Sequence, residues 1–412
     1  MRFHSDIQMS SSSNSHPEPV ALPISETGFD FQPRTRVIFG AGSFGRLGDV
    51  AKEFGGASRV LLVTDAGLRE AGHCDRASEL LSVAGLRVSV FDSVEPNPTT
   101  DDVDRCVEFA KAEDVNLIVG LGGGSSMDCA KGANFLLTNG GRMEDYKGVG
   151  KATSPMLPMI AVPTTSGTGS EAQSFAVIAD PRTHMKMPCG DPKAACRVAI
   201  LDPQLTVTMP HSVTTATGID AMTHAIESFV TIKRNPMSQM FARQAWQLLA
   251  GAFPLVMEDP ANVEARGHMQ LGAHLAGAAI ENSMLGAAHA TANPLSAHFK
   301  TVHGIAVGVM LPHVIRWNTP SVGDLYRELA MAAGWAGRVD TPDSGAAALA
   351  DGFTNLLETA GMPTSVSAAV STPLSDETIQ TLADEAALQW TGTFNPRRMD
   401  AEAFVQVYRN AG

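Results

Sequence analysis

The sequence predicts a protein of two parts, an open α/β sheet domain followed by a domain built of helices. Three observations lead to this prediction. From about residue 30 to 205, short β-branched runs alternate with amphipathic stretches, which is typical of an open sheet with parallel strands. From about residue 211 onward, Ala, Leu and Met recur at helical spacing, and no convincing strand is found. The chain has 412 residues, enough for two domains of roughly 150 residues or more.

The strands expected in the first domain are short and rich in valine, isoleucine and leucine. They lie at 59–64, 87–91, 116–120, 158–162 and 198–202, with a further strand-like run at 36–39. Amphipathic stretches at 67–84 and 101–113 lie between them and predict helices that cover the sheet. We therefore expect a Rossmann-like nucleotide-binding domain over residues 29–205.

The second half, residues 206–412, predicts a helical domain. Its helices are expected at 212–232, 236–253, 261–281, 323–335, 343–360 and 375–389, separated by proline and glycine. The first 28 residues differ from both domains, because they contain the serine run 10–13 and three prolines but no apolar segment behind a basic start. They predict a disordered polar extension rather than a secretory signal.

The composition excludes several classes of function. Against 43 acidic residues stand 30 basic ones, so the formal net charge is −13, and such a chain repels nucleic acid and anionic membrane surfaces. No apolar run approaches the roughly 18–20 residues of a transmembrane helix. The five cysteines are scattered and form no CxxC pair, which favours a reducing compartment, and we expect a cytoplasmic protein.

Two glycine-rich turns compete for one phosphate site. Gly40–Gly45 reads GAGSFG and is followed twenty residues later by Asp65, as in a dinucleotide-binding fingerprint. This motif alone is weak, since any tight turn from strand to helix favours glycine. Gly122–Gly124 also lies between an expected strand and a helix. Three consecutive glycines let backbone N–H groups approach an anion at a helix start, so we favour the second turn.

Two further segments predict a ligand site. Residues 163–171, PTTSGTGSE, form a hydroxyl-rich loop after an expected strand, where ligands bind in open α/β sheets. Asp220 and His224 are four residues apart in a helical stretch and so share one face. With His289 and His303 they would give one carboxylate and three imidazoles, a set suited to Fe(II), Zn(II) or Co(II). Taken alone, an Asp/His pair at this spacing is more often an exposed helix face or a salt-linked pair.

Read together, these segments resemble the iron-containing (group III) alcohol dehydrogenases, and they occur in that family's order. The matching segments are FGAGS (39–43), VTDAGL (63–68), EPNPT (95–99), GGGSSMDCAKG (122–132), PTTSGTGSE (163–171), LDP (201–203), TGIDAMTHAIES (217–228), HATANPL (289–295), HGIAVGVMLPHVIRWN (303–318) and NPR (395–397).

The resemblance implies a dehydroquinate synthase-like fold with the active site in a cleft between the two domains. It assigns four metal ligands, which are Asp220, His224, His289 and His303. It assigns the cofactor contacts Asp65, Asn97, Gly123, Gly124, Ser125, Asp128, Thr164, Thr165, Thr168 and Lys186. The acid Asp65 would contact the adenosine ribose and repel a 2′-phosphate, so NAD is expected over NADP. The same resemblance makes Gly40–Gly45 a structural turn.

The reaction implied is hydride transfer between a small alcohol bound to a divalent metal and C4 of the nicotinamide, with aldehyde reduction as its reverse. Fe(II) is the favoured metal and Zn(II) the second choice, and a homodimer or higher homo-oligomer is expected. The chain departs from the family at Asn293, where many members carry a histidine thought to relay protons. Asn293 would then line the substrate pocket, and His298 is the alternative relay.

Three other functions fit parts of this pattern. A metal-free maleylacetate-reductase-like enzyme would have no need of the four intact ligand positions. A dehydroquinate-synthase-like lyase would need a basic pocket for its substrate phosphate, and no Lys/Arg cluster surrounds the motifs of the second half. A regulator or scaffold that binds metal or nucleotide would have no need of two complete half-sites.

Overall fold

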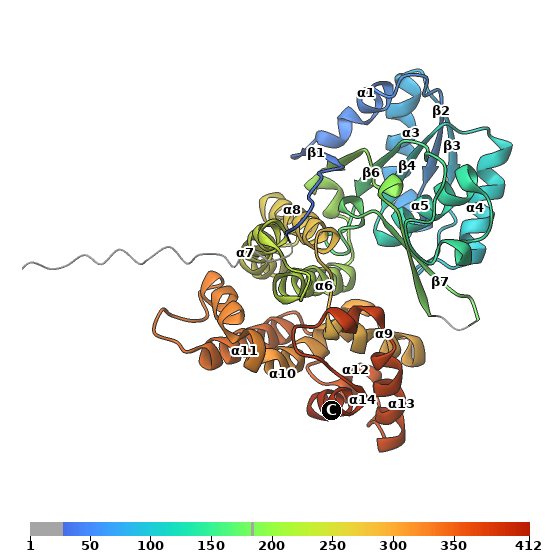
Figure 1. Cartoon of the computed structure of the whole chain (residues 1–412). Helices are drawn as coiled ribbons and strands as arrows, with labels where there is room; N and C mark the ends of the chain where they lie inside the picture. Colours follow the sequence, from blue (N-terminus) through green and yellow to red (C-terminus); the bar gives the residue numbers. More distant parts are fainter. Residues whose placement is uncertain (1–27, 183–184) are drawn as a thin grey trace, which may run out of the picture.

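The computed structural model describes residues 28–182 and 185–412. It consists of an α/β sheet part followed by a helical part, which confirms the predicted fold class (Figure 1). The polar extension expected at 1–28 lies outside the described residues, apart from Gly28. Among the described residues, none of the helices is both long and apolar enough to cross a membrane.

Within the described residues, six parallel strands form the main sheet in the order β1-β9-β6-β4-β2-β3. The strands are β1 (Arg36–Phe39), β2 (Arg59–Val63), β3 (Arg87–Phe91), β4 (Leu117–Gly122), β6 (Met159–Pro163) and β9 (Val198–Leu201). Strand β2 pairs with β3 on one side and with β4 on the other, so the winding direction reverses there. Ligands of open α/β sheets bind at such a switch point, beside the carboxyl ends of the strands.

The central strands β4 and β6 are buried along their whole length, because helices cover both faces of the sheet. The helices around the sheet are α1 (Leu47–Lys52), α2 (Ala66–Glu70), α3 (His73–Val83), α4 (Thr100–Ala112) and α5 (Gly124–Asn139). Side chains of α1 and α3 pack on one face of the sheet with Val119 and Ile160, and those of α4 and α5 pack on the other with Ile118 and Ala161. Alternate residues along each strand therefore belong to two separate cores.

Two details of the sheet domain differ from the sequence prediction. The single helix expected at 67–84 is two helices, α2 and α3, because Gly72 between them takes a left-handed conformation with φ of 80°. A smaller sheet of β5 (Gly148–Val149), β8 (Lys186–Gly190) and β7 (Phe175–Ala179) was not predicted. Strand β5 is too short to show a pattern, and β8 contains Pro188, which argues against a strand in sequence.

The second half contains helices and no strand over residues 211–412, all of which the structure describes. The helices are α6 (His211–Val230), α7 (Pro236–Glu258), α8 (Val263–Glu281), α9 (Ala287–Phe299), α10 (His303–Ala332), α11 (Pro342–Thr359), α12 (Val366–Val370), α13 (Asp376–Ala387) and α14 (Ala401–Ala411). Helices α6 and α8 lie between the sheet and α10–α14 (Figure 1). Helix α6 is buried along most of its length, so it is the centre of this half.

Helices α9 and α10 were not predicted as such. Pro294 lies inside α9, and Pro312 and Pro320 lie inside α10, which bends at Val322 where φ is −141°. Proline inside a helix removes a backbone hydrogen bond and weakens the sequence pattern. The stretch expected at 323–335 is the last part of α10.

Candidate metal and cofactor site

Four side chains from three helices meet around one carboxylate oxygen. Asp220 and His224 project from α6, His289 lies in the first turn of α9, and His303 is the first residue of α10. The Oδ1 atom of Asp220 lies 3.3 Å from Nε2 of His224, 3.5 Å from Nε2 of His289 and 3.9 Å from Nε2 of His303. The structure thus brings together the four residues predicted as metal ligands.

Asp220, His224 and His289 are buried, His303 is partly exposed, and the polar atoms of the cluster are incompletely paired. The rings of His224 and His289 stack with their centroids 4.8 Å apart, and His303 lies 5.3 Å from His289. Among the described residues, Oδ1 of Asp220 and Nε2 of His289 are buried without a hydrogen-bond partner. Leaving such atoms unpaired costs about 1–3 kcal/mol each, and a divalent cation between them would satisfy both. The donor set therefore fits a metal ion.

Burial and charge set the protonation of the cluster. Burial lowers the pKa of His224 to about 4, although the Asp220 carboxylate opposes the shift. Burial raises the pKa of Asp220, but His224, His289 and His303 together outweigh it, and the pKa falls below its usual range. Burial also keeps the pKa of His303 well below its ordinary value. An ionised Asp220 beside neutral His224 and His303 is the state that metal ligands require.

Glu227 adjoins the cluster and was not singled out from the sequence. It follows Asp220 by seven residues, two helical turns, so it lies on the same face of α6. Its carboxylate lies 2.6 Å from Nδ1 of His289. Burial lowers the pKa of His289, but the carboxylates of Glu227 and Asp220 together raise it to about 9. The seven-residue spacing was the signal that could have identified Glu227.

The predicted cofactor residues lie at the carboxyl ends of adjacent strands. Asp65 follows β2, Gly123 follows β4, and Thr164 follows β6. Ser126 Oγ donates to Asp65 Oδ2 over 3.3 Å, and the N–H of Thr164 donates to the carbonyl of Gly122 over 3.0 Å. The three loops are therefore joined at the switch point between β2 and β4.

The glycines after β4 have a packing reason in addition to any ligand. A Cβ atom on Gly123 would lie 3.2 Å from Cγ2 of Thr165, and one on Gly124 would lie 2.6 Å from Oγ1 of Thr168. The loop after β6 thus lies directly against the start of α5. The N–H of Asn97 donates to Oγ of Ser125 over 3.2 Å, which brings the loop after β3 to the same place.

Asp128 belongs to a buried network that holds this loop. Lys131, fully buried, donates from Nζ to the carbonyl and hydroxyl of Ser170 and to the carbonyls of Gln173 and Phe175. Ser170 Oγ in turn donates to Oδ1 of Asp128 over 2.7 Å. Burial raises the pKa of Asp128, and the charge of Lys131 opposes that shift. Asp128 is thus bonded within the protein.

Lys186 links the two halves of the site. It begins β8, and its charge interacts with both the Asp220 carboxylate of the cluster and the Asp128 carboxylate of the network. Burial lowers its pKa, while these two carboxylates raise it. The cofactor loops and the metal cluster therefore face a common cation.

The other glycine-rich turn has its donors occupied. The N–H groups of Gly42 and Phe44 donate to the two carboxylate oxygens of Asp202, over 3.1 and 3.0 Å. A helix start already capped by a carboxylate has no free N–H groups for a pyrophosphate. Gly40–Gly45 is thus a structural turn.

Asn293 and His298, the two residues considered in connection with proton transfer, lie on different sides of α9. Asn293 is one turn after His289 on α9, and its Nδ2 donates to Oε1 of Gln389 over 3.0 Å. His298 lies nine residues after His289, on the opposite side of the helix, with its side chain 42% exposed. Its Nε2 lies 2.9 Å from Glu385. The structure does not bring His298 to the metal cluster.

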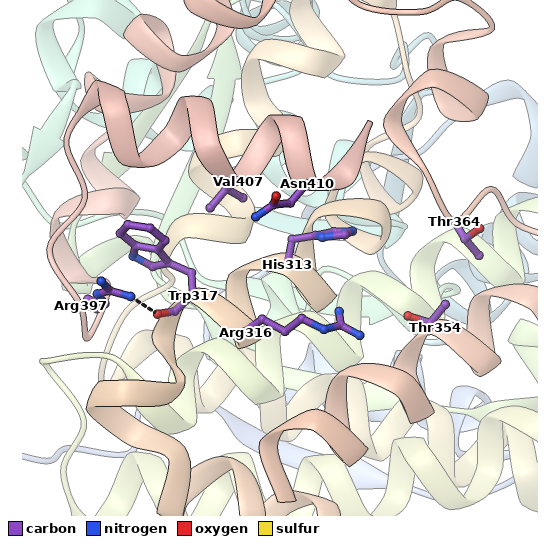
Figure 2. A pocket seen from close by; sticks show the side chains of 8 residues that line it. All are labelled: His313, Arg316, Trp317, Thr354, Thr364, Arg397, Val407 and Asn410. Atoms are coloured by element: carbon purple, nitrogen blue, oxygen red, sulfur yellow. Dashed lines mark hydrogen bonds between the residues drawn. The ribbon is translucent and has the colours of Figure 1, made fainter. Parts of the chain in front are cut away.

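A pocket of about 590 Å³ lies elsewhere, between α10, α11 and α14 (Figure 2). No predicted site residue lines it. Arg316 in this pocket pairs with Asp351 at 2.5 Å. Arg397 lies 3.9 Å above the ring of Trp317 and donates to its carbonyl. Both arginines are thus engaged within the protein, and this pocket is separate from the site described above.

Comparison with known proteins identifies the family of this chain. Residues 33–203 match the family model for iron-containing alcohol dehydrogenase, and residues 214–412 match the C-terminal model of the same family. An NAD-dependent methanol dehydrogenase of Bacillus methanolicus is 34% identical over 93% of this chain and all of its own. A crystal structure of 1,3-propanediol oxidoreductase superposes with a TM-score of 0.89 at 31% identity. The match covers 93% of this chain and 100% of that one. The crystal structure of sulfoacetaldehyde reductase from Bifidobacterium kashiwanohense in complex with NAD+ superposes with a TM-score of 0.83 at 28% identity. The match covers 93% of this chain and 98% of that one.

Proposed function

The chain belongs to the iron-containing alcohol dehydrogenase family and is a metal-dependent, NAD-linked alcohol dehydrogenase, and we propose that the cluster around Asp220 and the loops after β2, β4 and β6 form its active site. The observation that carries this proposal is the buried, unpaired Oδ1 of Asp220 surrounded by three imidazoles. The interaction of the Lys186 charge with both Asp220 and Asp128 supports a single site. The corresponding domains are 29–205 and 206–412, supported by the change from strands to helices between Leu201 and His211.

The metal ligands in this proposal are Asp220, His224, His289 and His303. One carboxylate and three imidazoles suit Fe(II), Zn(II) and Co(II), and the family's iron-containing members favour Fe(II). When bound, such an ion lowers the pKa of the alcohol oxygen and stabilises its anionic form. Helices α6, α9 and α10 hold the four side chains, so the positions of the ligands are set by the fold before substrate binds.

NAD binds across the loops in this proposal. The start of α5, with Gly123, Gly124 and Ser125, offers backbone donors to the pyrophosphate. Asn97, Thr164, Thr165 and Thr168 line the same edge, and Lys186 lies between the cofactor and the metal cluster. Asp65 faces the adenosine ribose and disfavours a 2′-phosphate by charge. The nicotinamide accepts the hydride.

The substrate is a small alcohol or, in the reverse direction, an aldehyde. Asn293 lies one turn from His289 and is held by Gln389. Its amide does not titrate, so we assign it to the substrate pocket rather than to proton transfer. Among the described residues, His298 does not contact the cluster and is left out of the site.

We also propose a homo-oligomer, at least a dimer, in a reducing compartment, the cytoplasm. Strand β1 lies at the edge of the main sheet, and Val37 and Phe39 on it are 40% and 45% exposed. An exposed apolar edge strand pairs readily with another chain. The five cysteines are all free and buried, which supports a reducing environment.

Metal analysis tests the central proposal. The protein is purified without oxygen, its metal content is measured, and activity with NAD is followed after chelation and after addition of Fe(II) or Zn(II). We expect chelation to abolish turnover and Fe(II) to restore it more fully than Zn(II). Full activity of the chelated protein would instead favour the metal-free, maleylacetate-reductase-like chemistry.

A further inference from the structure

Glu227 is a deeply buried carboxylate on the face of α6 that carries Asp220 and His224. Its exposed fraction is 3%. A buried carboxylate is costly unless its oxygens are bonded. The bonds that Glu227 makes therefore indicate what it does in the structure.

Both oxygens of Glu227 are bonded to the first turn of α9. Oε1 accepts the N–H of Ala288 over 2.6 Å, and Oε2 lies 2.6 Å from Nδ1 of His289. The first N–H groups of a helix lack intrahelical acceptors, so a carboxylate there also caps the helix. One side chain thus holds both the start of α9 and the ring of His289.

This bond decides which nitrogen of His289 is free. Because Nδ1 faces a carboxylate oxygen, it carries the hydrogen when the ring is neutral, as in a metal ligand, and Nε2 is then left as the acceptor. Nε2 is the atom that lies 3.5 Å from Oδ1 of Asp220 and lacks a partner among the described residues. Histidines that bind metals usually donate their other N–H to a carboxylate or carbonyl in this manner.

We propose that Glu227 is a positioning residue for the metal centre, which holds His289 in the tautomer and orientation that turn Nε2 toward Asp220. The inference rests on the proposed metal site. Glu227 itself does not contact the metal in this proposal; it acts through His289.

The surroundings of Glu227 are built around this role. A Cβ atom on Gly286, the residue before α9, would lie 2.9 Å from Oε1 of Glu227, so the carboxylate occupies the space of a side chain there. The next N–H, that of Ala287, donates to Oδ1 of Asn395 over 3.3 Å. Asn395 is in turn bonded to Asn318 over 2.7 Å. Three distant segments therefore converge on the turn that carries His289.

An amide cannot replace this carboxylate. The N–H of Ala288 and Nδ1–H of His289 are both donors, and glutamine offers one acceptor oxygen and one NH2 group. Glu227→Gln therefore leaves one donor facing another donor. Glu171 is a matched control, because it is similarly buried and pairs with Nδ1 of His274 at 3.2 Å, a histidine outside the proposed ligand set.

The experiment is a Co(II) titration of the chelator-treated full chain without oxygen, in competition with a chelator of known affinity. The visible absorption of the bound Co(II) is recorded, because it depends on ligand geometry. We expect Glu227→Gln to lower the Co(II) affinity roughly 10- to 100-fold and to change the spectrum. Glu171→Gln should change neither, and NAD binding by metal-free Glu227→Gln should be unaltered.

Each outcome decides the inference. Equal Co(II) affinity and an unchanged spectrum in Glu227→Gln would overturn it, and so would an equal loss of affinity in Glu171→Gln. If Glu227→Gln does not fold by circular dichroism, Glu227→Asp is used, which keeps the charge but moves it away from α9. Affinity equal to that of the unaltered chain then overturns the inference, and a loss supports it. If the unaltered chain binds no Co(II), the proposed metal site itself fails.

Discussion

Two buried groups of polar side chains in this molecule differ in how completely their atoms are hydrogen-bonded. In the network of Lys131, the ammonium is surrounded by acceptors from Ser170, Gln173 and Phe175. In the cluster of Asp220, Oδ1 of Asp220 and Nε2 of His289 are buried without a hydrogen-bond partner among the described residues. Protein interiors normally pair such atoms, so the complete network is a scaffold and the incomplete cluster is where a ligand belongs.

The same difference separates residues that a family motif places together. Asp128 and Lys131 lie in the motif that also contains the glycines proposed to bind the pyrophosphate. Their side chains point into the network and join α5 to the loop after β6. A motif residue can therefore also hold the loops of a site together through its bonds within the protein.

The largest effect is expected from removing the charge at the centre of the cluster. Asp220→Asn keeps the shape of the side chain but replaces the charged carboxylate by a neutral amide, which has one oxygen and one NH2 group. We expect bound metal to be lost and kcat to fall by roughly 10³-fold or more, since a bound ion contributes several kcal/mol to stabilising the reacting oxygen. Metal analysis measures the loss of the ion, and the rate of NAD reduction measures the fall in kcat.

The comparison requires that this change leave the scaffold intact. The urea midpoint of metal-free Asp220→Asn should stay close to that of the metal-free unaltered chain. Full metal occupancy in the variant would contradict the assignment of Asp220 as a ligand.

In the network of Lys131, a substitution is expected to lower stability and to leave metal binding unchanged. Lys131→Met removes the cation that interacts most strongly with the buried Asp128 and leaves three carbonyl oxygens without this donor. Removing one partner of a buried pair costs roughly 3–5 kcal/mol, and urea unfolding measures the loss. Co(II) affinity of the folded variant should remain that of the unaltered chain.

Arg76 provides the control for this prediction. It pairs with Glu79 at 2.8 Å, and the two side chains are 56% and 62% exposed. An exposed pair contributes roughly 1 kcal/mol or less, so Arg76→Met should lower the free energy of unfolding far less than Lys131→Met. Equal losses in the two variants would remove the distinction between the network and an ordinary ion pair.

Much of the sheet domain could be predicted from sequence, because buried parallel strands are continuous apolar runs. Strands β2, β3, β4, β6 and β9 fall on those runs. The break at Gly72 and the strand β8 could not be predicted, since one depends on a positive φ and the other contains Pro188. These features depend on backbone conformation and tertiary pairing, which leave little trace in local composition.

Only part of the candidate site could be predicted from the spacing of residues along the chain. Helical spacing places Asp220 and His224 on one face, and the same rule would have added Glu227. Spacing could not place His289 beside His303, because they lie on separate helices whose packing brings them together. The resemblance to a family supplied that convergence. The bonds of Asp128 and Lys131 to the loop after β6 are likewise tertiary.

The smallest effect is expected at the edge of the cofactor loops, where one charge is proposed to select NAD. Asp65 also caps α2, since its Oδ1 accepts the N–H of Leu68 over 3.1 Å. Asp65→Ser keeps a capping oxygen and removes the charge, so a change in cofactor choice can be separated from a loss of structure. Two charges about 4 Å apart interact by about 1 kcal/mol in water and by more near a protein surface.

We therefore expect Asp65→Ser to raise kcat/KM with NADP relative to NAD by roughly tenfold. Metal content and the urea midpoint should stay unchanged, because Asp65 belongs to neither the cluster nor the network of Lys131. Steady-state kinetics with both cofactors provide the measurement. An unchanged preference would remove Asp65 from the selection of NAD. A shift with loss of metal would show that the cofactor loops and the metal cluster are coupled, and that the contrast between a complete scaffold and an incomplete metal cluster is too simple.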